Sequence, residues 1–113
     1  MVKKEDEIML RKLIKNYKSS NGSKDSLELM VAGVTYVSKL KPNIKDNILS
    51  LMETLCLILL AIGKNPYQCG NFLDISVKTV RTYEQRARKK LGAKNRVNAF
   101  YLAQMHGYVS FAP

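Results

Sequence analysis

Residues 77–91 combine a cationic, hydrogen-bonding stripe with an apolar stripe at helical spacing. The polar stripe consists of Lys78, Arg81, Thr82, Gln85, Arg88 and Lys89. The apolar stripe consists of Val80, Tyr83, Ala87 and Leu91. A helix of this kind can pack on a core with one side and present positive charge and donors to a polyanion with the other. A solvated cationic helix has the same composition, so the pattern alone leaves both interpretations open.

The charge of the whole chain favours a polyanionic partner. The sequence has 19 Lys and Arg against 9 Asp and Glu, a net charge of +10 over 113 residues. Residues 76–113 alone hold eight basic side chains and one acidic one, Glu84. A field concentrated in one third of the chain indicates a binding face for nucleic acid, an anionic membrane or an acidic protein.

Other chemistries find little support in the sequence. One histidine, no paired catalytic carboxylates and no phosphate-cradling glycine loop indicate that this is not an enzyme. Cys56 and Cys69 stand in apolar surroundings, which is typical of buried thiols in a reducing cytoplasm, and with His106 they lack zinc-ligand spacing. The apolar run 55–62 is far shorter than the roughly 20 residues of a membrane span. We therefore expect no catalytic residue, metal or cofactor, no membrane, and a cytoplasmic protein.

The elements that position the stripe are expected to be six helices and no strand, an all-α fold. Apolar periodicity and capping residues predict helices at residues 5–18, 25–40, from 44 or 50 to 62, 66–73, 77–91 and 96–107. Asp25 with Glu28 is expected to open the second, and Pro42 to end it. Asn65, Ser76 and Asn95 are N-cap candidates. We expect an N-terminal helical extension at 1–43 and a second unit at 44–113.

A short helix, a tight turn at 74–76 and a basic helix form the arrangement of a helix-turn-helix unit. Three separated blocks then resemble one family. The opening Leu49-Ser50-Leu51-Met52-Glu53, the block Leu73-Asp74-Ile75-Ser76-Val77-Lys78-Thr79-Val80-Arg81 and the block Lys90-Leu91-Gly92-Ala93-Lys94-Asn95-Arg96 are similar to the LuxR/GerE (NarL/FixJ-type) family. Gly63 falls where that family has a glycine, and the resemblance extends from 49 to about 107 without a gap.

The resemblance implies a four-helix LuxR-type domain, preceded here by two amphipathic helices, in a sequence-specific transcriptional regulator without a receiver domain. Residues 77–91 would be its recognition helix in the major groove of double-stranded DNA. Base-reading positions of the family match Arg81, Thr82 and Gln85, whose side chains suit guanine, a thymine methyl and adenine. The expected phosphate contacts are Asn65, Tyr67, Lys78, Thr79, Arg88 and Lys89.

The last helix commonly forms the dimer contact in this family, which implies Phe100, Leu102 and Ala103 as contact residues of a homodimer. Binding as a monomer stays open. The chain departs from the family at Cys69-Gly70, in place of Ile-Ala, and at Tyr83, in place of a histidine. Glu84 places an acid beside the groove-facing stripe, where it can accept from a cytosine amino group.

The helix ending at residue 62 is apolar on two sides. Leu51, Leu55, Ile58 and Ile62 recur on its second side. We expect the helices within residues 5–40 to cover this side, either in the same chain or across a dimer.

Two other functions compete with the leading one. The first is an interaction protein that pairs with a full-length regulator and modulates it, although the intact basic stripe argues against a pure decoy. The second is a module like sigma-factor region 4, which the block 91–96 and the additional final helix disfavour. A partner regulator and RNA polymerase are further candidate partners.

Overall fold

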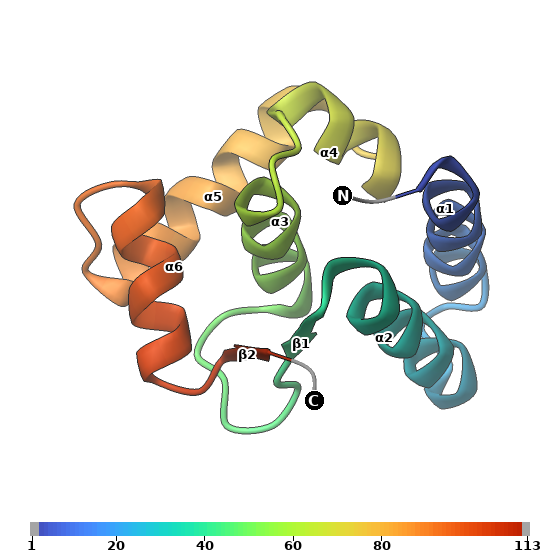
Figure 1. The fold of residues 1–113 in the computed structure, drawn as a ribbon, viewed down its shortest axis with the longest axis horizontal. Coiled ribbons are helices and arrows are strands. Elements are labelled where there is room, and N and C mark those ends of the chain that lie inside the picture. Colours follow the sequence, from blue (N-terminus) through green and yellow to red (C-terminus); the bar gives the residue numbers. More distant parts are fainter. Residues whose placement is uncertain (1–2, 112–113) are drawn as a thin grey trace.

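A computed structural model describes residues 3–111 of the chain, which fold into six helices and two short strands (Figure 1). The predicted all-α class is confirmed. Residues 1–2 of the predicted segment 1–43 and residues 112–113 of the predicted segment 44–113 lie outside the described range. The elements are α1 (Lys4–Ser19), α2 (Lys24–Ser38), β1 (Leu40–Pro42), α3 (Leu51–Ala61), α4 (Pro66–Leu73), α5 (Val77–Leu91), α6 (Arg96–Met105) and β2 (Val109–Phe111).

The expectation that the chain has no strand is wrong. β1 pairs antiparallel with β2, with Leu40 opposite Phe111 and Pro42 opposite Val109. Helix α2 therefore ends at Ser38, before the predicted residue 40, because Lys39 turns into the left-handed region at φ 60°. Pro42 lies in the strand, where its missing N–H is tolerated because each strand of a two-stranded sheet has an unpaired edge.

Side-chain caps fix where the helices begin. Ser50 opens α3 in a reciprocal capping box with Glu53, so of the two predicted starts residue 50 is right and residue 44 is wrong. The predicted caps Asn65, Ser76 and Asn95 are confirmed. Helix α2 is capped by Ser23, one residue before Lys24, so the predicted start at Asp25 with Glu28 is wrong.

Helix α3 is the centre of the core. Leu55 and Ile58 are 1% and 0% exposed, and they belong to one cluster with Ile14 of α1 and Met30 of α2. Figure 1 shows α3 between the α1–α2 hairpin on one side and α5 with α6 on the other. The two N-terminal helices thus cover the second apolar side of α3 within the same chain, as one of the two predicted alternatives had it.

Polar contacts hold α1 along α4. The Lys18 ammonium donates to the backbone carbonyls of Leu73 and Asp74, at 2.9 Å each, where α4 ends. At the other end Lys64, just before α4, forms an ion pair with Glu7. Because a cation is stabilised by the carbonyls at a helix C-terminus, Lys18 caps α4 from outside its own segment.

Candidate nucleic-acid interface

The turn between α4 and α5 is tight because residue 70 is a glycine. Its carbonyl accepts hydrogen bonds from Asp74 N–H and from Ile75 N–H, the latter at 3.0 Å. A Cβ at residue 70 would lie 2.6 Å from the carbonyl oxygen of Ile75, closer than real Cβ contacts. Asp74 then reverses the chain at φ 56°, and Ser76 caps α5. The departure from Ile-Ala thus permits a close approach of the two backbones.

Helix α5 divides its two sides as predicted. Val80 and Ala87 are fully buried, and Tyr83 and Leu91 are half-buried against the core. Lys78, Arg81, Gln85 and Lys89 are exposed, whereas Thr82 and Arg88 are half-buried. The exposed residues show that the N-terminal helices leave the cationic side of α5 open to a partner.

Two ion pairs fix the orientation of α5. Lys90 donates to the buried Glu53 carboxylate of α3 at 2.8 Å. The guanidinium group of Arg96 in α6 donates hydrogen bonds to both carboxylate oxygens of Glu84, at 2.5 and 3.2 Å. The hydrogen bond to Glu84 raises the pKa of the Arg96 guanidinium. The Glu84 carboxylate is thus held by Arg96 rather than free beside the groove-facing stripe, and its contact with a cytosine stays a prediction.

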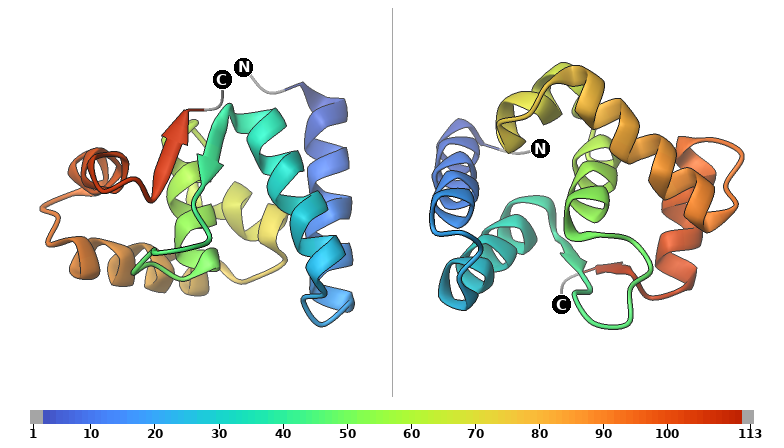
Figure 2. Two further views of the ribbon diagram at one scale, coloured as in Figure 1. Left: turned by 90° about the horizontal axis from the view of Figure 1, so that it is seen from below. Right: turned by 180° about the vertical axis from the view of Figure 1, so that it is seen from behind.

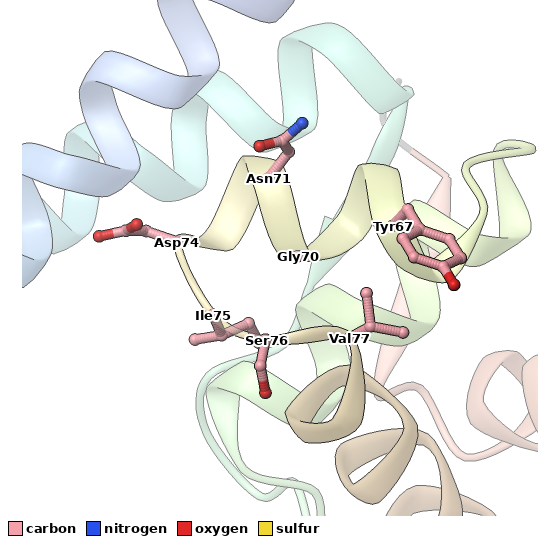
Figure 3. Close-up of a pocket in the computed structure, with 7 residues that line it drawn as sticks. All are labelled: Tyr67, Gly70, Asn71, Asp74, Ile75, Ser76 and Val77. Carbon is pink, nitrogen blue, oxygen red and sulfur yellow. The ribbon is translucent and has the colours of Figure 1, made fainter.

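The residues expected to bind phosphate come from both helices of the unit. Figure 3 shows Tyr67 of α4 and Val77 of α5 at the surface hollow beside the turn, with the Asp74 carboxylate directed away from α5. Asn65 caps α4 through its side-chain oxygen, and Thr79 Oγ1 lies 2.8 Å from Ser76 Oγ at the start of α5. Arg88 donates to the Lys94 carbonyl at 2.9 Å. Their binding of phosphate stays a prediction.

Helix α6 presents a different apolar side from the one expected. Ala103 is 0% exposed in the core of its own chain, and Phe100 and Leu102 are half-buried. Ala103 therefore cannot make the expected outward dimer contact. Val97, Tyr101 and Met105 are exposed instead, and their spacing of four residues in the sequence indicates one side of a helix.

Residues 47–103, just over half of the chain, match the family model described as bacterial regulatory proteins, luxR family. The chain belongs to the luxR family. This membership confirms the resemblance drawn from the three sequence blocks. The family match is to luxR-type regulators and not to the alternative, a module like sigma-factor region 4. Helix-turn-helix DNA binding and transcription regulation are the function class of the luxR-type domain, which here begins before α3 and ends within α6.

One curated luxR-type relative supports the assignment. The chain is 28% identical over 96 residues to the transcriptional activator protein VanR of Vibrio anguillarum, covering 84% of this chain and 40% of that protein. The chain thus spans less than half of the relative's length. No solved structure matches the chain.

The two cysteines lie in the core of the luxR-type domain. Burial raises the pKa of the Cys56 thiol to about 12 and that of the Cys69 thiol to about 11, because both favour the neutral form away from water.

Between residues 3 and 111, no helix has the length and apolarity to cross a bilayer. The same range contains no cluster of three or more His, Cys, Asp or Glu able to hold a metal ion.

Proposed function

We propose that this protein is a sequence-specific transcriptional regulator whose α5 enters the major groove of double-stranded DNA. The observation that carries the proposal is the division of α5: its apolar side is anchored in the core, and its donor-rich side is open. Arg81, Thr82 and Gln85 read base edges in this proposal. Lys78, Thr79, Arg88, Lys89, Asn65 and Tyr67 contact phosphates.

Selection of bound duplexes from a random DNA pool tests the proposal. We expect one preferred motif, bound with an affinity that falls steeply as salt rises, since each neutralised phosphate releases counterions. Arg81→Ala should relax the preference at one base pair. Lys89→Ala should weaken all sequences alike and lower the salt slope by about 0.9. Recovery of no enriched motif, with equal binding of all duplexes, would contradict sequence-specific reading.

A gel shift with the protein alone separates this proposal from the interaction-protein alternative. A regulator shifts duplex DNA without help, whereas a modulator that works only through a full-length regulator shifts it only in the partner's presence. The exposed donors of α5 favour the first outcome.

We further propose that the protein binds DNA as a two-fold dimer through α6. Val97, Tyr101 and Met105 supply an exposed apolar side that a second copy can cover. The selected motif should then be an inverted repeat. Tyr101→Glu should lower the solution mass to that of the monomer and weaken binding to the repeat, whereas an unchanged mass and affinity would contradict this contact.

A further inference from the structure

The C-terminal end of α1 lies beside the turn that opens the recognition helix. Lys18 contacts the carbonyl of Asp74, two residues before the N-cap Ser76. Lys15, Lys18, Ser19 and Asp74 line one surface hollow. In the left view of Figure 2, the α1–α2 loop and α5 lie on the same side of the molecule, at the bottom. A partner that approaches α5 from this side therefore also meets the end of α1.

This end of the hairpin is positively charged. Helix α1 carries its acids Glu5, Asp6 and Glu7 in the first turn, at the far end. Lys15 and Lys18 occupy the last turns, and both are exposed. The Lys18 ammonium is bonded to two backbone carbonyls, and among residues 3–111 neither Lys15 nor Lys18 takes part in an ion pair.

One acid opposes these lysines. The exposed Asp74 carboxylate points from the turn toward α1 (Figure 3). The Asp74 carboxylate forms no ion pair with Lys15 or Lys18, so its oxygens lie more than 4.0 Å from either ammonium nitrogen. The two lysines outnumber the one acid, and Asp74 with the carbonyl ends of α1 and α4 reduces the positive field of the hollow.

We propose that the C-terminal end of α1 is a second phosphate-binding surface, which contacts the DNA backbone next to the site that α5 reads. Lys15 is the contacting residue, and Lys18 positions the end of α1 on α4 while adding charge. Because Lys18 contacts the carbonyl of Asp74, two residues before the N-cap of α5, DNA held by α5 would bring its backbone phosphates next to this end of α1. The inference rests on the proposed binding of DNA by α5.

The surface belongs to this chain rather than to the common domain. Residues 15 and 18 precede the matched range 47–103, so the luxR-type domain alone does not include them. Backbone contacts of this kind fix register and raise affinity without reading sequence. The α1–α2 hairpin would thus enlarge the DNA site beyond the base pairs under α5.

Two duplexes and one matched pair of variants test this surface. One duplex ends at the selected motif, and the other extends it by about 8 base pairs, roughly 27 Å, on either side. Lys15→Ala removes the proposed contact. Lys41→Ala removes another exposed lysine, on β1, which lies toward the opposite side from α5 (Figure 2). Affinity is measured as a function of salt for each combination.

We expect the unchanged protein to bind the longer duplex several-fold more tightly and with a steeper salt slope. Lys15→Ala should lower that slope by about 0.9 per contacting protomer and leave the shorter duplex and the base preference unaffected. Lys41→Ala should behave as the unchanged protein. Asp74→Asn should tighten binding to the longer duplex, because it removes the opposing charge and asparagine also tolerates the left-handed backbone.

Equal salt slopes for Lys15→Ala and Lys41→Ala on the longer duplex would overturn the inference. Sequence-specific binding whose preference Arg81→Ala relaxes at one base pair would still stand in that case, so the proposed function would survive. If the unchanged protein binds neither duplex, the proposed function itself fails, and the inference fails with it.

Discussion

Individual polar and charged residues of α5 fall into two groups according to what they contact. Lys90 and Glu84 face the protein and tie α5 to α3 and α6. Arg81, Gln85 and Lys89 face solvent. Helical periodicity predicts most of this division, because 100° per residue separates the two sides. It does not predict the role of Glu84, which stands near the boundary and is drawn inward by Arg96 of another helix.

Arg81→Lys tests base reading separately from charge. The substitution keeps the positive charge but removes the planar fork that gives a guanine two parallel hydrogen bonds. We expect a loss of about 1–3 kcal/mol of discrimination at one base pair, with little change in the salt slope. Competition between the selected duplex and one with that base pair exchanged measures the loss. A preserved discrimination would show that residue 81 does not read a base.

The buried thiols should be unreactive in the folded protein. With a pKa of about 12, Cys56 is ionised in about one molecule in ten thousand at pH 8. We expect alkylation of Cys56 and Cys69 to be negligible in the native protein and rapid in denaturant. Labelling in the native state at the rate of a free thiol would contradict their burial.

The same thiols give the stability a pH dependence with a definite sign. Their folded-state pKa values lie above the ordinary value of 9.0, so the folded state favours the protonated form. This contribution is complete below about pH 9 and is lost as the pH rises toward 11 and 12, because the unfolded chain releases its thiol protons first. Denaturant titrations at pH 8 and pH 10 should show lower stability at pH 10, and Cys69→Ser should reduce the difference.

Among the elements, the α4–α5 turn depends on the absence of a side chain at residue 70. Gly70→Ala should lower the free energy of unfolding by about 1–3 kcal/mol, because the new Cβ meets the backbone of Ile75. Gly33→Ala is the matched control within α2. There a Cβ would lie 2.4 Å from Leu13 Cδ1, the end of a side chain that can turn away, and in ordinary contact with Leu10. Alanine also gains up to about 1 kcal/mol of helix propensity over glycine. Equal effects of the two variants in denaturant titrations would contradict this account of the turn.

The helices could be predicted from sequence because each one has its own signal. Ser50, Asn65, Ser76 and Asn95 all cap helices through local hydrogen bonds. The strands could not be predicted, because three residues are too few to show an alternating pattern and β1 pairs with a segment at the other end of the chain. The contact of Lys18 with α4 was missed for the same reason, since it joins residues 55 positions apart.

The molecule as a whole is held together by a core that includes both predicted segments, 1–43 and 44–113. Leu10 and Val34 belong to the same buried cluster as Leu55 and Val80. We therefore expect the two segments to unfold together. The division of the chain into the units 1–43 and 44–113 stays a prediction from the sequence. Because the buried cluster is shared, removal of residues 1–43 should expose the second apolar side of α3.

Leu55→Ala measures this coupling. It should lower the free energy of unfolding by about 2–5 kcal/mol, since it opens a cavity in a fully buried position. Ile48→Ala changes a residue that is 52% exposed and should alter stability by less than about 0.5 kcal/mol. Fluorescence of tyrosines in both segments and far-UV dichroism should give one coincident transition. Two separate transitions would contradict a common core.

The central claim, that the open side of α5 lies against base-pair edges, is tested most directly by disulfide crosslinking to DNA. The buried native thiols leave a cysteine introduced by Gln85→Cys as the reactive one. A duplex of the selected motif carries a base whose tether opens into the major groove and ends in a mixed disulfide, from which the protein thiol displaces a small thiol. Gln85→Cys should crosslink to it, and Leu29→Cys, at a 55% exposed position on α2, should not. Failure of Gln85→Cys to crosslink while the protein stays bound, or equal crosslinking by Leu29→Cys, would contradict the claim.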